Sequence, residues 1–286
     1  RVANRDFNLE VSATDVYADT GPDLDVTNIK RDVELYFAVP GSVQVGANGN
    51  VAVTYLTAGG AVKVQSRNSA ITAEHVVAGP AGDVWLHAHT DLRVAAATHS
   101  GDAGAVRAGR DVRLQANGTI ASAGEVTAGR AFTAVAHGDV AVSGPVRAGA
   151  TLDVASSQGR VQVAASLFAG GALTLTAATS LTTAAGFTLS AGGDMTLRAG
   201  SGFASLGADM HAGAGTTLVS DVLVVARGNV TVAGDVTATG DITVRSLAGD
   251  VTVAGDMTAG YWITLDAWGA VTTTGELDAG EGINIV

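Results

Sequence analysis

The chain has 286 residues and a formal net charge of −11, so it repels phosphate backbones and we expect no nucleic-acid partner. It contains no cysteine, which excludes disulfides and thiolate metal sites, and no apolar run long enough to span a bilayer, so we expect no membrane span. Glycine is abundant (38 residues) and aromatic residues make up 5%, a composition that favours short strands joined by tight turns over helices.

The first forty residues are less regular than the rest. Strand-like patterns occur at residues 7–11, 24–26 and 33–39, and the Gly21-Pro22 and Pro40-Gly41 pairs indicate turns. We interpret residues 1–40 either as a less regular N-terminal segment or as the first irregular coils of the domain that follows.

From residue 41 onward a repeat dominates the sequence. Its marker is an Ala-Gly pair that recurs at a nearly constant interval. We place these markers at Ala58-Gly59, Ala81-Gly82, Ala108-Gly109, Ala128-Gly129, Ala148-Gly149, Ala169-Gly170, Ala191-Gly192, Ala212-Gly213, Ala259-Gly260 and Ala279-Gly280. Longer intervals before Ala108 and Thr239 predict insertions, the first within residues 97–103.

Each repeat divides into three short stretches of alternating apolar and polar residues, separated by glycine. Three strands and three turns in about 20–22 residues make one rung of a solenoid, because a rung buries its apolar side only against its neighbours. We therefore predict an all-β, three-sided, right-handed parallel β-helix over residues 41–286, of about eleven or twelve rungs.

The repeat units also resemble a known family. Ala108-Gly109-Arg110-Asp111-Val112, residues 169–175 (AGGALTL), residues 191–197 (AGGDMTL) and residues 239–244 (TGDITV) look like filamentous haemagglutinin repeats. That family comprises large exoproteins exported by two-partner secretion in Gram-negative bacteria, and the resemblance covers residues 41–286. It implies a secreted or cell-surface shaft, an outer-membrane two-partner transporter during export, and a host-cell glycan or protein receptor as partner.

The most site-like stretch is Trp85-Leu86-His87-Ala88-His89. Alternate side chains of a strand share a face, so Trp85, His87 and His89 are expected to point the same way. Two imidazoles at this spacing can share a metal ion, with His99 of the predicted insertion as a third ligand. The alternatives are a partner-contact patch and a face with no specific role, and we predict no metal site.

Three further aromatic residues, Tyr261, Trp262 and Trp268, crowd into one repeat. Exposed, they would stack on sugar rings or anchor a protein partner; buried, they would fill a wide rung. Because Tyr261 and Trp262 are adjacent, at least one is expected to face outward. We assign all three as possible partner contacts.

Acidic residues recur at matching places after glycine. Asp235, Asp256 and Glu276 follow one another at the interval of the repeat, so stacking would bring their carboxylates close together. The alternatives are a calcium-binding edge and a solvated ladder of turn residues, and we predict no cofactor.

Some polysaccharide-acting enzymes also use parallel β-helices, but they need carboxylates and a basic residue clustered on one face. The acids here lie mostly one to a repeat, and no cluster of lysine or arginine accompanies them. We therefore predict no catalytic residues and no enzymatic activity. The leading hypothesis is an adhesive shaft segment that contributes to virulence; the alternatives are a polysaccharide-acting enzyme and the receptor-binding part of a contact-dependent inhibition toxin.

Overall fold

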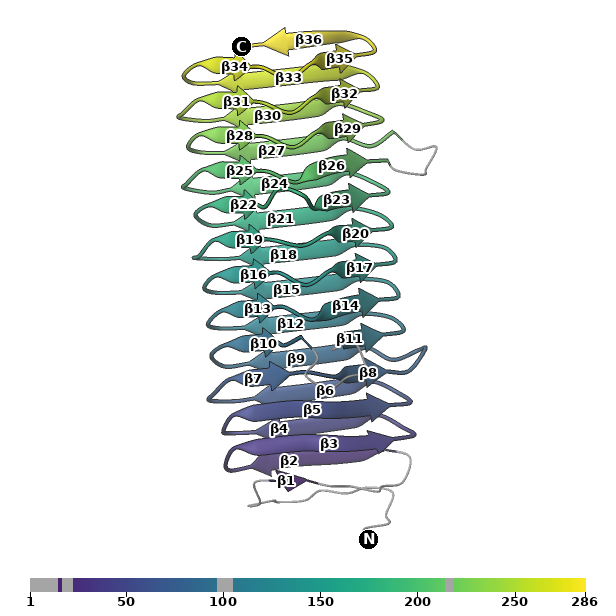
Figure 1. Ribbon diagram of the computed structural model, residues 1–286. Helices are drawn as coiled ribbons and strands as arrows, with labels where there is room; N and C mark the ends of the chain where they lie inside the picture. The colour runs from purple at the N-terminus through teal and green to yellow at the C-terminus, as the bar shows by residue number, and fades with distance from the viewer. Residues whose placement is uncertain (1–14, 17–22, 97–104, 214–218) are drawn as a thin grey trace. The chain divides into compact units, whose positions relative to one another are not determined.

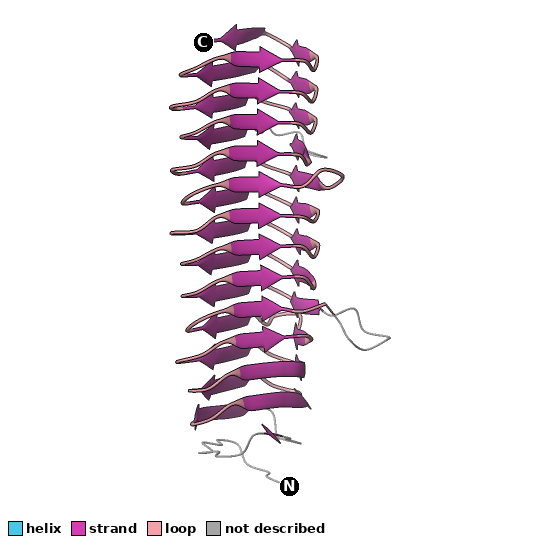
Figure 2. Cartoon of the chain, turned by 60° about the vertical axis from the view of Figure 1, so that its left-hand side comes forward, coloured by secondary structure: helices cyan, strands magenta, loops and turns pink. Residues whose placement is uncertain are grey.

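The computed structural model describes residues 15–16, 23–96, 105–213 and 219–286, and every regular element among them is a β-strand (Figures 1 and 2). No helix in these ranges is long and apolar enough to cross a membrane. The chain divides into two compact units. Unit 1 comprises residues 1–138 and 143–145, and unit 2 comprises residues 139–142 and 146–286.

Unit 1 consists of parallel strands stacked rung upon rung. Its first sheet contains β2 (Leu24–Ile29), β4 (Val43–Ala47), β6 (Val62–Ser66), β9 (Val84–Ala88), β12 (Val112–Ala116) and β15 (Phe132–Ala136). Its second sheet contains β1 (Asp15–Val16), β3 (Val33–Val39), β5 (Val51–Ala58), β7 (Ile71–Ala73), β8 (Val76–Ala78), β10 (Leu92–Val94), β11 (Ala105–Ala108), β13 (Ile120–Ser122) and β14 (Glu125–Ala128). Within one rung, strands of this sheet come in pairs, such as β13 and β14.

Unit 2 repeats the same plan. Its first sheet contains β18 (Leu152–Ser156), β21 (Leu173–Ala177), β24 (Met195–Ala199), β27 (Val222–Ala226), β30 (Ile242–Ser246), β33 (Trp262–Ala267) and β36 (Gly282–Ile285). Its second sheet contains β16 (Val140–Val142), β17 (Val146–Ala148), β19 (Val161–Val163), β20 (Leu167–Ala169), β22 (Leu181–Thr183), β23 (Thr188–Ala191), β25 (Ala204–Leu206), β26 (Asp209–Ala212), β28 (Val230–Val232), β29 (Val236–Ala238), β31 (Val251–Val253), β32 (Met257–Ala259), β34 (Val271–Thr273) and β35 (Leu277–Ala279).

The predicted all-β parallel solenoid is confirmed in both units. Each strand pairs in parallel with its counterpart one rung away; Leu152, for example, lies opposite Leu173, and Leu173 opposite Met195. Most inward residues are apolar and alternate with outward ones, as in β21, where Leu173, Leu175 and Ala177 are buried. The period-two pattern therefore becomes columns of apolar side chains along the inside of each unit.

The Ala-Gly marker has a steric origin. Ala128 is 3% exposed and ends β14 inside the core, where the chain turns toward the next strand. The next residue, Gly129, passes so close to the rung before it that a Cβ atom would collide with the carbonyl oxygen of Gly109. Similar clashes occur at Gly79, Gly170 and Gly280. The repeat thus needs a small buried residue followed by one without a side chain.

One marker was placed wrongly from the sequence. Ala58 lies opposite Ala78, and a Cβ on Gly79 would meet the backbone of Gly59, so the marker is Ala78-Gly79 rather than Ala81-Gly82. Gly82 instead follows a tight turn in which its amide donates to the carbonyl of Gly79. The extra residues at this corner duplicate the pattern and shift its apparent position.

Residues 24–39 belong to the same stack as the later repeats. β2 pairs in parallel with β4, and β3 pairs in parallel with β5, each with one shift of register. The shifts fall between Val26 and Ile29 and between Leu35 and Tyr36. These bulges account for the weaker periodicity of this part of the sequence.

Candidate partner-contact surfaces

The strand that carries Trp85 and His87 presents both side chains outward. In β9 the alternate residues Val84, Leu86 and Ala88 are buried, which leaves Trp85 and His87 on the outer side. Their rings lie 5.4 Å apart at 42°, and the ammonium of Lys63, one rung earlier, sits 4.6 Å from the Trp85 ring centre. The indole is therefore covered on one side by a cation.

The surroundings of His87 disfavour a charged imidazole. Partial burial lowers the pKa of His87, and the nearby His89 and Arg113 lower it further. Its Nδ1 atom is buried and has no hydrogen-bond partner among the described residues. A second ring proton would therefore add charge close to cations, in a position with poor solvation.

The predicted metal alternative gains no support from the geometry. His89 is exposed just after β9, and its Nδ1 atom lies 3.4 Å from the side-chain amide nitrogen of Asn117. Within the described residues, no group of three or more His, Asp or Glu side chains is arranged to hold a metal ion. His99 and the predicted insertion at residues 97–103 lie outside the described residues.

The outward positions around Trp85 form a surface that we name the cationic face. It comprises the outward residues of β6, β9, β12 and β15 and the residue that follows each strand: Lys63, Gln65, Arg67, Trp85, His87, His89, Arg113, Gln115, Asn117, Thr133, Val135 and His137. No carboxylate occurs among these described positions. Lys63, Trp85 and Arg113 lie in register on three consecutive rungs.

Acids border this face at both edges: Asp83 and Asp111 stand just before strands begin, and Asp91 and Asp139 stand two residues after His89 and His137. Asp83 is 3.8 Å from the guanidinium of Arg110, and Asp111 pairs with Arg130 at 2.6 Å. The hydrogen bond from Arg130 lowers the pKa of Asp111, against the opposing effect of partial desolvation. Arginines on neighbouring positions therefore neutralise the carboxylates of Asp83 and Asp111.

A second aromatic cluster of unit 1 was not found from the sequence. Tyr36 and Tyr55 lie opposite each other in β3 and β5, with ring centres 5.4 Å apart. The ring of His75 stacks on Tyr55 at 4.8 Å and 9°. The spacing of these three residues matches the interval of the repeat and is the signal that could have revealed the column. Tyr36 is 54% exposed, so the column ends in an accessible ring.

The predicted aromatic repeat of unit 2 faces solvent. Tyr261, Trp262 and Trp268 are 40%, 45% and 83% exposed, so both members of the adjacent pair are accessible. The indole N–H of Trp262 donates to Oε2 of Glu281 at 2.7 Å, and its ring lies against Gly282, where a Cβ would be only 2.6 Å from it. Trp262 is thus fixed in place, whereas Trp268 projects from the turn after β33.

The predicted acidic ladder is part of the backbone hydrogen bonding of unit 2. Oδ1 of Asp235 accepts the N–H of Asp256 at 2.9 Å, and Oδ1 of Asp256 accepts the N–H of Glu276 at 2.8 Å. Asp209 begins the series by accepting the N–H of Asp235 at 3.1 Å. Each carboxylate therefore satisfies an amide at the corner of the following rung, which is what the turn-ladder alternative expects.

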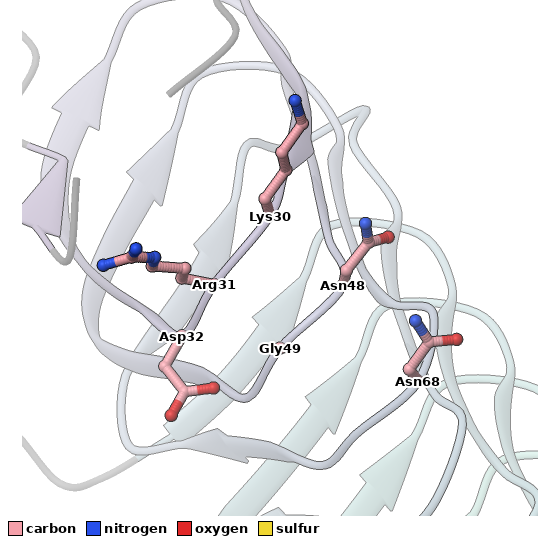
Figure 3. A pocket seen from close by; sticks show the side chains of 6 residues that line it. All are labelled: Lys30, Arg31, Asp32, Asn48, Gly49 and Asn68. Atoms are coloured by element: carbon pink, nitrogen blue, oxygen red, sulfur yellow. The ribbon is translucent and has the colours of Figure 1, made fainter. Parts of the chain in front are cut away.

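A shallow depression of about 580 Å³ lies at a corner of unit 1, between the ends of β2 and β4 and the starts of β3 and β5. It is lined by Lys30, Arg31, Asp32, Asn48, Gly49 and Asn68 (Figure 3). Asp32 accepts the backbone N–H of Asn50 at 2.7 Å, so it has a structural role here. In Figure 3 the side chains of Lys30 and Arg31 extend in different directions.

Comparison with known proteins adds no relative: no protein-family model, no curated protein and no solved structure matches the chain.

Proposed function

We propose that the chain is an adhesive shaft segment of a secreted or surface-displayed bacterial exoprotein of the filamentous haemagglutinin type. The observation that carries this proposal is that regular backbone ladders hold an outward aromatic side chain, Trp262, in a fixed position. In unit 2 the first-sheet strands continue in register from β18 to β36, so every rung is held by its neighbours.

Rigid presentation is the proposed mechanism. Binding costs less when the contacting side chain is already ordered, because less conformational freedom is lost. Trp262 has that property, since Glu281 holds its N–H and the backbone of Gly282 supports its ring. Trp262 and Trp268 would contact a glycan or protein receptor on a host cell, because exposed indoles stack on sugar rings and act as hot spots at protein interfaces. Export through an outer-membrane two-partner transporter is part of the same proposal.

The test is binding of the purified protein to host cells, measured by flow cytometry over a range of protein concentrations. The double variant Trp262→Ala/Trp268→Ala should weaken binding at least tenfold. Phe203→Ala is the matched control, because Phe203 is an aromatic residue of the same unit with 48% exposure and lies outside this group. Equal binding by wild type and the double variant would contradict the assignment, and no binding by wild type would refute adhesion by this segment.

A further inference from the structure

Charge is distributed unevenly along the chain. Residues 1–138 contain 11 Lys and Arg with 14 Asp and Glu, whereas residues 139–286 contain 5 Arg with 13 Asp and Glu. The cationic face defined above concentrates part of the positive charge on one side of unit 1. Its permanent cations are Lys63, Arg67 and Arg113, with three imidazoles among them.

The acidic ladder of unit 2 has the opposite character. Asp209, Asp235, Asp256 and Glu276 are all exposed and lie at the starts of matching strands on four consecutive rungs. At a rung spacing of about 4.8 Å, neighbouring carboxylates repel by about 1 kcal/mol in water. No ion pair to any of the four occurs within the described residues. For the three aspartates, one oxygen accepts a backbone N–H, which leaves the other free for a cation.

The geometry points to a second copy of this chain as the partner of the cationic face. We propose that the cationic face of one molecule docks on the acidic ladder of another. Both surfaces rise by the same rung spacing, so their charges can pair in register. Lys63 and Arg113 are two rungs apart, about 10 Å, as are Asp209 and Asp256.

This contact joins two different surfaces, so it is heterologous. Such contacts either close into a ring or continue into an open filament. In either case the result is a lateral bundle of solenoids. The inference goes beyond the adhesive function proposed above and does not depend on it.

Two chains of charge −11 repel each other overall, and the salt concentration affects this repulsion differently from the local attraction between the two surfaces. The screening length is about 10 Å at 0.1 M salt, which shortens the reach of the net repulsion but leaves charges in contact able to attract. At 1 M the length is about 3 Å, and the attraction between exposed charges is largely lost. Association should therefore weaken at least tenfold between 0.1 M and 1 M NaCl.

The experiment is sedimentation velocity on the whole chain, at several protein concentrations in 0.1 M and 1 M NaCl. Wild type should associate in a concentration-dependent manner at 0.1 M. Lys63→Glu/Arg113→Glu should weaken association at least tenfold. Arg198→Glu/Arg227→Glu is the control, because it changes the net charge equally at two exposed arginines of unit 2 and should associate more tightly than Lys63→Glu/Arg113→Glu.

The second surface is tested with a neutral ladder, Asp209→Asn/Asp235→Asn/Asp256→Asn/Glu276→Gln. The amides keep an oxygen for the backbone N–H groups, so circular dichroism should match wild type while self-association is lost. Mixing this variant with Lys63→Glu/Arg113→Glu should restore association, because each supplies the surface that the other lacks. Wild type that stays monomeric, association that the face variants do not alter, or a mixture that stays monomeric would overturn the proposal. Wild type that binds an acidic polysaccharide such as polygalacturonate but does not self-associate would also overturn it.

Discussion

Replacement of Gly129 by alanine tests the steric origin of the Ala-Gly repeat. A Cβ atom at this position would collide with the carbonyl oxygen of Gly109 and lie 2.8 Å from its carbonyl carbon. These are backbone atoms of the preceding rung, so no side chain can move aside. The two rungs must separate locally, although the amides of Gly129 and Arg130 donate across them to Ala108 and Arg110 at 3.0 and 2.8 Å.

The magnitude follows from two contributions. Overpacking of a tightly packed site costs roughly 1–3 kcal/mol, and weakening a backbone hydrogen bond costs about 1 kcal/mol. Gly129→Ala should therefore lower the free energy of unfolding by about 2–4 kcal/mol. Gly46→Ala is the matched control in the same unit, since the atoms nearest to its Cβ lie 3.7 Å away. Its effect should stay within about 0.5 kcal/mol, or be slightly stabilising through the unfolded chain.

The assay is urea unfolding followed by far-ultraviolet circular dichroism, together with amide hydrogen exchange. Exchange is needed because a chain of stacked repeats can unfold in parts, and a single transition is then not a complete description. Faster exchange should be confined to the corner around Gly129 and its neighbouring rungs. Equal stability of Gly129→Ala and Gly46→Ala, with unchanged exchange at that corner, would refute the steric explanation.

Three further predictions concern single polar side chains. Burial raises the pKa of Asp153, so its ionised form destabilises the fold as pH rises above about 4. Asp153→Thr would place a threonine opposite Thr174 of the next rung and should raise stability at pH 7 by roughly 0.5–1 kcal/mol. No gain in melting temperature would contradict this. The pKa of His87 is lowered in the folded state, so its contribution to stability is present above about pH 6.5 and is lost as pH falls through the folded-state pKa. The slope of melting temperature against pH between 6.5 and 5 should therefore be smaller in His87→Gln than in wild type. An unchanged slope would contradict this prediction. Asp256→Ala should lower the free energy of unfolding by about 0.5–1.5 kcal/mol, because it leaves the N–H of Glu276 without its acceptor, whereas Asp256→Asn should be near neutral. Equal losses of the two variants in urea unfolding would show that the carboxylate charge matters rather than the acceptor.

The repeat made the fold predictable, because one residue pattern recurs where the backbone recurs. Alternating apolar residues with Ala-Gly pairs define inward columns and tight corners, and both are physical requirements of stacked rungs. The error at Ala81-Gly82 arose where extra residues near Gly79 copied the marker. Sequence spacing cannot distinguish such a copy from the corner that packs on Gly59.

The surfaces were less predictable than the core. Trp85 and His87 follow the strand alternation, so their outward direction could be anticipated, but the cation above Trp85 comes from Lys63 on the preceding rung. The stack from Tyr36 to His75 was missed because three different sequence contexts supply it and a bulge shifts the register beside Tyr36. Contacts between rungs depend on register, which insertions and bulges alter without a local sequence signal.

The corner aspartates also give assembly a direction. In each pair described above, the acceptor belongs to the earlier rung and the donor N–H to the later one: Asp209 accepts from Asp235, and Asp235 from Asp256. A chain that emerges amino-terminus first therefore displays its carboxylates before the matching amides arrive. Each completed rung is a template with its acceptors already in place, and the solenoid can grow in the order in which its residues become available.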